Sequence, residues 1–256
     1  MMLETVDLYV GAGAQAFSTL RSFGGEASQG DAYAGFNVCH YTGDDPAHVA
    51  RCRRVLAQFA DVATLIIPRQ THSVNVAVIG EETVIGDEMP DLDGVDALVT
   101  RRDDVALVIN TADCLPVVFN DPEAGVTGIA HAGWRGLYDG VIERTVEAME
   151  RLGASKNAMR AAIGPCICGA CYEVDWDFAR RFAERFGEGV VNGSGVKPHV
   201  DLRAAALIAL GRECIGADRV EVATECSRCD NRLFSARRMG ISSGRIATVV
   251  RKIKKN

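Results

Sequence analysis

The chain has 256 residues, of which 48% are hydrophobic and 24% charged, a composition typical of a globular protein with one large domain or two small ones. Its net charge of −6 argues against nucleic acid as a partner, and no run approaches the roughly 18 apolar residues that a membrane helix needs. Because the N-terminus lacks the features of a signal peptide and the nine cysteines are odd in number, we expect a cytoplasmic protein with mostly free thiols and no membrane partner.

Apolar runs in the first half of the chain predict one helix and several strands. The helix should cover residues 44–60, where Asp45 is the expected cap and Pro46 fits the first turn. The strand candidates are short apolar runs bounded by turn residues, and they lie at 6–10, 62–68, 74–80, 96–100, 105–111, 115–120 and 125–132. The turn at 121–125 should join the last two as a hairpin.

The second half of the chain predicts three helices and a final strand. They comprise a helix from about Leu137 to Leu152 that Gly153 ends, a helix in which Phe178, Phe182 and Phe186 recur every four residues, a helix capped by Asp201, and a strand at 245–250. We interpret the aromatic stripe as core packing. The Gly-rich stretch 21–35 should be a surface loop, and the basic end 251–256 should be solvated. Hairpins mixed with helices indicate an α/β fold in the broad sense (α+β), with a mixed β-sheet and covering helices.

Three side chains at strand ends are candidates for a metal site. Cys114 stands between two predicted strands, His72 lies in a polar break between two others, and His131 ends a strand that the small residues of AGWRG follow. Two histidines and one cysteine form a credible zinc set, with the fourth position left for water. The remaining histidines are interpreted as structural or solvated: His40, His48 and His199.

Spacing alone leaves other interpretations of these residues open. Cys114 is equally well a buried thiol beside histidines that bind backbone carbonyls, or a nucleophile with His131 as its base. The segment GAGAQA at 11–16 mimics a dinucleotide-binding fingerprint, but no helical pattern follows it. The segment PCICGAC resembles half of the nucleoside-deaminase signature, yet no histidine is followed by x-E.

Five further cysteines lie in two short segments that could build a structural zinc site. The pairs are not in zinc-ribbon spacing, so we favour free thiols. These residues are Cys166, Cys168, Cys171, Cys226 and Cys229.

The segments QTHS, ADCLPVVF, HAGWRG, IGPCICGACYEV and FSARRMG resemble the polyphenol oxidase or laccase-domain family (YfiH-like), whose members are also described as purine nucleoside phosphorylases. The resemblance covers nearly the whole chain and implies one domain over 1–256. It implies the metal ligands His72, Cys114 and His131, and a layered α/β arrangement shared with cysteine-type toxin deamidases. The implied activity is phosphorolysis of adenosine, inosine and methylthioadenosine, with hydrolytic deamination of adenosine.

Two positions depart from the family pattern. The usual Asn-Arg pair of the first helix reads Cys52-Arg53, and a usual histidine is Tyr41, which puts substrate contacts near that helix in doubt. The older family name implies copper-dependent oxidation of phenols. Five histidines with no H-x-H are too few for a multicopper cluster, so zinc is expected and copper is not favoured.

The implied chemistry assigns further roles as hypotheses. Zinc lowers the pKa of bound water to about 7, and Asp113 is either a proton carrier or a turn cap beside the ligand Cys114. Arg53 is the first choice for holding phosphate, with Arg135 and Arg238 behind it, although each is otherwise a surface ion pair. The alternatives are a metal-independent hydrolase, with Cys114 as nucleophile and His131 as base, and a binding module without turnover.

Overall fold

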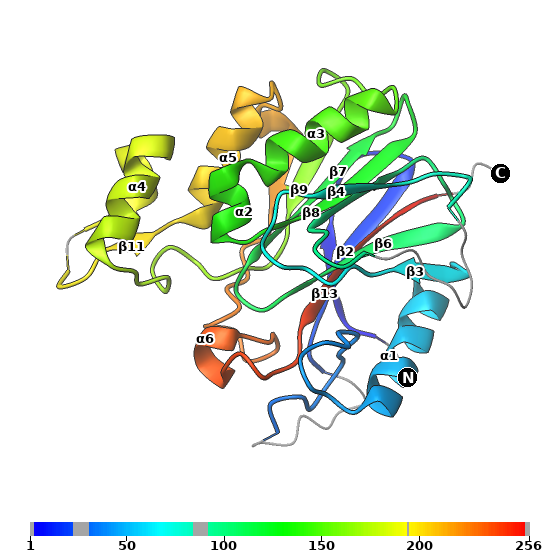
Figure 1. Cartoon of the computed structure of the whole chain (residues 1–256), viewed down its shortest axis with the longest axis horizontal. Coiled ribbons are helices and arrows are strands. Elements are labelled where there is room, and N and C mark those ends of the chain that lie inside the picture. Colours follow the sequence, from blue (N-terminus) through cyan, green and yellow to red (C-terminus); the bar gives the residue numbers. More distant parts are fainter. Residues whose placement is uncertain (1–2, 23–30, 84–91, 194, 254–256) are drawn as a thin grey trace.

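The computed structural model describes residues 3–22, 31–83, 92–193 and 195–253, and Figure 1 shows strands at its centre with helices on the outside. Parts of the expected loop at 21–35 and of the expected tail at 251–256 lie outside these residues. The strands are β1 (Thr5–Leu8), β2 (Ala14–Thr19), β3 (Thr64–Ile66), β4 (Val76–Ile79), β5 (Ala97–Thr100), β6 (Val105–Thr111), β7 (Leu115–Asp121), β8 (Val126–Ala132), β9 (Arg160–Ile163), β10 (Val191–Asn192), β11 (His199–Val200), β12 (Val220–Val222) and β13 (Ile246–Lys252). The α-helices are α1 (Pro46–Phe59), α2 (Trp134–Asp139), α3 (Val141–Arg151), α4 (Trp176–Phe186), α5 (Leu202–Arg212) and α6 (Ala236–Met239).

Two mixed sheets carry the fold. The five-stranded sheet has the order β1-β2-β13-β6-β3, and the six-stranded sheet has the order β12-β9-β7-β8-β5-β4. In the six-stranded sheet β12 and β9 run parallel, as do β4 and β5, while β7 is antiparallel to both β8 and β9. The expected hairpin of residues 115–132 is therefore confirmed, and it lies in the middle of the sheet.

Apolar side chains join the two sheets and their helices into four layers. Between the sheets, Leu107 and Ile109 of β6 belong to the same buried cluster as Val118 and Ile129 of the β7–β8 hairpin. On the far side of the five-stranded sheet, Leu56 of α1 packs with side chains of β6 and β13, while α3 and α5 pack on the far side of the six-stranded sheet. Burial of each such side chain contributes about 1.5–3 kcal/mol. The layered arrangement confirms the expected α/β fold with covering helices.

Several local predictions are confirmed and one is wrong. Asp45 and Asp201 cap α1 and α5 through their carboxylates, and Phe182 of the aromatic stripe lies in the core. The single helix expected over 137–152 is two helices, α2 and α3, because Gly140 between them has a φ of 99°. Only glycine adopts this left-handed conformation without steric cost, so the chain turns at this residue.

The sequence did not predict the strands β2, β9, β10, β11 and β12 or the short helix α6. Strand β9 is four residues long and contains two alanines, and β12 has three residues, so neither produces a strong apolar pattern. The segment GAGA leads into β2 and not into a helix, which confirms that it is no dinucleotide fingerprint. Among the described residues no helix combines the length and the apolarity that crossing a membrane requires.

Candidate metal centre

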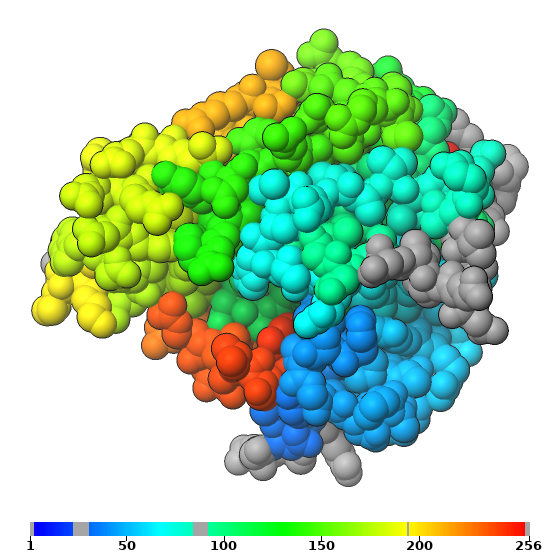
Figure 2. Space-filling view, in the orientation of Figure 1, coloured from blue at the N-terminus to red at the C-terminus, as the bar shows by residue number. Residues whose placement is uncertain are grey.

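The β7–β8 hairpin brings the predicted ligands Cys114 and His131 together at one end of the central strands of the six-stranded sheet. β7 begins directly after Cys114, and His131 lies opposite Pro116 at the end of β8. β5 begins directly after Asp96 and is antiparallel to β8, so Asp96 reaches the same end. Figure 2 shows the surface hollowed where the green, cyan and orange-red parts of the chain meet.

His72, Cys114 and His131 converge as the resemblance implied. Their three ligand atoms all lie within 4.8 Å of one another, and Cys114 Sγ is 3.5 Å from His72 Nε2. A tetrahedral zinc with Zn–S of about 2.3 Å and Zn–N of about 2.0–2.1 Å places such a sulfur and nitrogen about 3.5 Å apart. His131 is buried, Cys114 partly buried and His72 exposed, so the group is open to solvent on one side. The geometry fits a three-ligand metal site with one open position.

Asp96 holds both histidines, and sequence reasoning missed it. Its Oδ1 lies 2.7 Å from His131 Nδ1 and accepts the backbone N–H of His72 at 3.0 Å. Its Oδ2 accepts the backbone N–H groups of Thr71 and Ser73 at 3.0 and 2.7 Å. The hydrogen bond at Nδ1 leaves Nε2 of His131 for a metal, which is the arrangement of a carboxylate–histidine–metal triad.

The charge of Asp96 is secured by its partners. Burial raises the pKa of this carboxyl, but the hydrogen bond and charge of His131, together with Ser73, outweigh burial and hold the pKa at about 2. The same contacts stabilise the left-handed backbone of His72, whose φ is 62°. This conformation is unfavourable for a residue with a Cβ, so three hydrogen bonds to one carboxylate explain why the loop keeps it.

Gly133 packs directly against the three candidate ligands. A Cβ at this position would lie 2.6 Å from His72 Cδ2 and 3.2 Å from both Cys114 Sγ and His131 Nε2. The φ of Gly133 is −57°, so a larger residue is excluded by the ligands and not by backbone conformation. A glycine at this position therefore lets the three side chains come together, and the expectation that the small residues leave room above the imidazole stays a prediction.

The charged forms of Cys114 and His131 stabilise each other. Burial raises the pKa of Cys114, but the charge of His131 and hydrogen bonds from both histidines bring it down to about 6. Burial likewise lowers the pKa of His131, whereas the Cys114 thiolate and the Asp96 carboxylate raise it to about 9. A thiolate is the form of cysteine that binds metals and attacks carbon, so the centre suits either role.

Asp113, the proposed proton carrier, points away towards the loop before α6. Its carboxylate accepts hydrogen bonds from the hydroxyls of Ser227 and Ser235 and from the backbone N–H of Arg237, each at 2.6 Å. Its φ of 87° is left-handed, as turn aspartates tolerate. These contacts favour the alternative interpretation of Asp113 as a turn residue that holds the strand end carrying Cys114.

The three arginines proposed for phosphate lie in different settings. Arg135 of α2 is exposed and lies over the ring of Trp134, with its guanidinium carbon 4.9 Å from the ring centroid. Arg238 donates to the backbone carbonyls of Ser227 and Arg228 at 2.8 and 2.7 Å, so it holds a loop. Arg53 lines a cavity of about 670 Å³ on the α1 side of the molecule.

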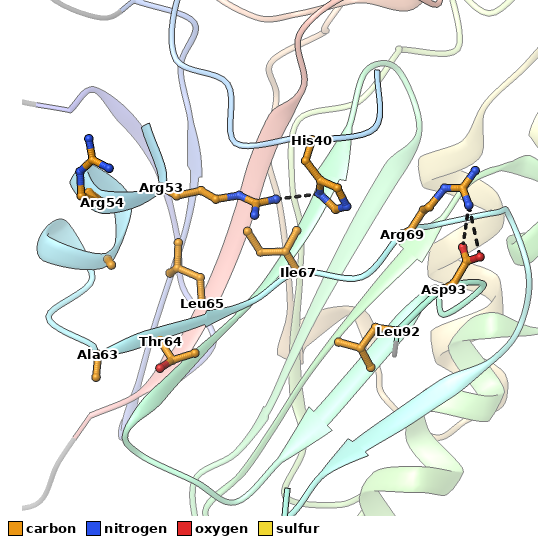
Figure 3. Close-up of a pocket in the computed structure, with 11 residues that line it drawn as sticks. His40, Arg53, Arg54, Ala63, Thr64, Leu65, Ile67, Arg69, Leu92 and Asp93 are labelled. Atoms are coloured by element: carbon orange, nitrogen blue, oxygen red, sulfur yellow. Dashed lines mark hydrogen bonds and ion pairs between the residues drawn. The ribbon is translucent and has the colours of Figure 1, made fainter. Parts of the chain in front are cut away.

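The cavity beside α1 is lined by arginines but not by the three metal ligands. Figure 3 shows Arg53 extended towards His40, with Nη2 of Arg53 2.7 Å from His40 Nδ1. Arg69 lies at the opposite side of the same cavity, where it pairs with Asp93 at 3.2 Å. The segment from Arg69 to His72 runs from this cavity to the metal centre, so the two are neighbours along the chain.

The two departures from the family pattern have structural partners. Cys52 is buried in α1, with its sulfur 3.5 Å from His48 Nε2. Tyr41 donates to Gln70 Oε1 at 3.2 Å, and Gln70 in turn pairs with the backbone of Asn110 at the end of β6. Tyr41 therefore supports the loop that contains Gln70, whereas Cys52 belongs to the buried cluster beneath α1. His40, expected to be structural or solvated, contacts Arg53 and borders the cavity.

The cysteine-rich segments also converge. The sulfurs of Cys168, Cys171, Cys226 and Cys229 all lie within 4.8 Å of one another, although the sequence had favoured separate free thiols. Cys166 stays outside this group, where Arg203 Nε donates to its sulfur at 3.3 Å.

Comparison with known proteins decides the family. The model of a family described as multi-copper polyphenol oxidoreductase laccase matches residues 15–252. The chain belongs to this laccase family. It is 42% identical to adenosine deaminase RL5 of an unknown prokaryotic organism, over 92% of this chain and 93% of that protein. It is 39% identical to a purine nucleoside phosphorylase of Deinococcus radiodurans, over 85% of this chain and 82% of that one.

Solved structures of similar proteins share the fold. Neisseria meningitidis protein NMB0706 superposes with a TM-score of 0.85 at 32% identity, covering 98% of this chain and 99% of that chain. YlmD of Geobacillus stearothermophilus gives a TM-score of 0.85 at 27% identity, covering 95% and 93%. Within the described ranges, His72 and His131 are the two histidines that join a group able to hold a metal.

Proposed function

We propose that this chain is a zinc-dependent enzyme of purine nucleosides, which cleaves adenosine, inosine and methylthioadenosine with phosphate and also deaminates adenosine. The observation that carries the proposal is the convergence of His72, Cys114 and His131, with Asp96 fixing the second histidine. The names of the relatives, adenosine deaminase and purine nucleoside phosphorylase, supply the substrate class.

Zinc is the metal that this donor set favours. Two imidazole nitrogens and one thiolate are borderline and soft donors, and three protein ligands with an open fourth position are typical of catalytic zinc. Zinc bound there would supply a polarising charge and would acidify water at neutral pH. Copper oxidation of phenols requires a redox-active metal cluster, which the donors found together in the described residues do not build.

The chain's own residues prepare this centre. Asp96 fixes the tautomer of His131 and the loop of His72, so that both rings face Cys114 without reorganisation. Gly133 lets the three ligand side chains pack against its backbone. Asp113 fastens the turn before Cys114 to the loop of Ser227, and we propose that this positioning is its main contribution.

Arg53 and Arg135 are the residues that we propose for phosphate. Arg135 follows the metal ligand His131 by four residues at the start of α2, and its exposed guanidinium is accessible to an anion. Arg53 borders the cavity beside α1. Its Nε donates to the backbone carbonyl of Val38, and its Nη2 contacts Nδ1 of His40. Arg238 contributes less to anion binding, because its donors serve backbone carbonyls.

A metal-independent hydrolase is the second candidate, and one observation favours it. Cys114, His131 and Asp96 lie in the order of a cysteine–histidine–carboxylate triad, and the pKa of the thiol is lowered to about 6. A thiolate poised beside an imidazolium is the usual nucleophile of such enzymes. In that case turnover would persist after removal of metal.

The test combines metal analysis with a nucleoside assay. Base release from inosine and adenosine should be measured across a phosphate series, together with the zinc content of the protein. We expect base release to depend on phosphate and on zinc. Release without phosphate dependence would indicate a hydrolase, and copper-dependent phenol oxidation without any base release would reject the proposal.

A further inference from the structure

Two CxxC turns leave neighbouring parallel strands of the six-stranded sheet. Cys168 and Cys171 follow β9, and Cys226 and Cys229 follow β12, which pairs with β9 in parallel. The bridge between residues 166 and 226 continues this pairing beyond the regular strands. Each turn is closed by its own backbone, with the N–H of residue 171 bonded to the carbonyl of 168 and that of 230 to the carbonyl of 226. The fold therefore places two cysteine pairs opposite each other.

The four sulfurs have the spacing of a tetrahedral thiolate site. All lie within 4.8 Å of one another, and Cys171 Sγ is 3.3 Å from Cys229 Sγ. Four sulfurs bound to one zinc at about 2.3 Å would lie about 3.8 Å apart, which is within the observed range. The backbone N–H of Cys168 donates to Cys226 Sγ at 3.3 Å, a contact that stabilises a thiolate.

The donor set identifies the ligand class. Four cysteines in two C-x2-C pairs, with no carboxylate or imidazole among the four donors, are typical of closed structural zinc sites. We propose that Cys168, Cys171, Cys226 and Cys229 bind a second, thiophilic divalent ion of the zinc class, with no open position for substrate. This site is separate from the His72 centre, and the proposal does not depend on the proposed activity.

The second site lies where it could stabilise the turn before Cys114. The loop 226–230 contains Ser227, whose hydroxyl donates to Asp113, the neighbour of Cys114. The other loop contributes the N–H of Ile167, which donates to the backbone carbonyl of Asp113 at 3.0 Å. An ion that joins the two loops would therefore hold both supports of the turn that precedes Cys114.

The test is a count of metal ions in full-length variants purified without added metal. Wild type should contain about two ions per chain, and both Cys114→Ala and the double variant Cys226→Ser/Cys229→Ser should contain about one. Cys214→Ser, at an exposed cysteine outside both groups, is the matched control and should keep the wild-type content. An unchanged metal content in the double variant would overturn the proposal.

A second measurement protects the test if the double variant does not fold. X-ray absorption of the Cys114→Ala protein, which retains all four cysteines, should show a shell of four sulfurs at about 2.3 Å from the metal. A shell with nitrogen or oxygen, or a Cys114→Ala protein without metal, would contradict the proposal. A disulfide between Cys171 and Cys229 in wild type isolated under reducing conditions, seen by mass as a loss of two hydrogens, would contradict it as well.

Discussion

Oδ1 of Asp96 lies 2.7 Å from Nδ1 of His131, and the same oxygen accepts the backbone N–H of His72. One buried carboxylate thus sets the orientation of one proposed metal ligand and the backbone of the other. Neither histidine would be preorganised without it, because His72 has a left-handed backbone and an imidazole alone does not specify its tautomer.

Replacing Asp96 by asparagine should therefore weaken metal binding at this centre about 10–100-fold, as is usual when the partner of a metal-bound histidine is lost. The amide has nearly the shape of the carboxylate but no charge, and it must present one donor where Asp96 presents only acceptors. Zinc affinity can be measured by competition with a chelator, with Asp177→Asn on the surface of α4 as the control. Equal affinity in the two variants would show that Asp96 does not support the ligands.

Replacing Gly133 by alanine tests the close packing of the ligands against this glycine. The added Cβ would lie 2.6 Å from His72 Cδ2, so His72 must move and metal content should fall. Overpacking of this kind costs about 1–3 kcal/mol, which should appear as a modest loss of stability. Gly211→Ala, where a Cβ would meet nothing within 4 Å, is the control. Normal zinc content and turnover in Gly133→Ala would mean that the ligands do not depend on this close packing.

Metal binding at the centre should strengthen as the pH rises. Between the pKa of Cys114, about 6, and that of His131, about 9, the metal-free centre holds a thiolate and an imidazolium. Binding through Nε2 of His131 must displace one proton, so affinity should rise about tenfold per pH unit in this interval. Zinc affinity should be measured for wild type and for Cys114→Ala at each pH. The difference between the two proteins reports binding at this centre. An affinity that does not change between pH 6 and 9 would contradict the assignment of His131 as a ligand.

Arg53→Ala should raise the phosphate concentration needed for turnover and leave the metal content unchanged. The variant removes one charged hydrogen-bond donor, worth about 1.5–3 kcal/mol, and keeps all three ligands. Arg54→Ala is a matched control from the same helix and the same cavity wall. If the phosphate dependence of Arg53→Ala equals that of Arg54→Ala, then Arg53 does not bind phosphate.

The sequence predicted the parts of the centre that lie on one hairpin. The strands at 105–111, 115–120 and 125–132 are continuous apolar runs with clear turn signals, so Cys114 and His131 could be placed at neighbouring strand ends. Asp96 was missed because its partners come from other segments, 35 residues away at His131. An acidic residue directly before the buried strand β5 was the available signal.

The group of four cysteines was also missed because its members are distant in the sequence. Cys168 and Cys226 are 58 residues apart, and only the parallel pairing of two short strands, β9 and β12, brings them together. The spacing of the cysteines along the sequence therefore argued against a zinc site, although the fold brings the four sulfurs together. For Asp113 the sequence was misleading in the opposite direction. Its position next to Cys114 suggested a proton carrier, whereas its carboxylate accepts hydrogen bonds that hold the turn before Cys114.

Return of activity to metal-stripped protein would test the zinc-dependent phosphorolysis most directly. Phosphate-dependent release of hypoxanthine from inosine should be measured on wild type after removal of metal, and again after titration with zinc. We expect little release without metal, recovery with zinc, and no recovery in Cys114→Ala, in which one of the three proposed ligands is missing. Full phosphorolysis by the stripped wild-type protein would contradict this expectation and would indicate chemistry performed by Cys114 and His131 without a metal.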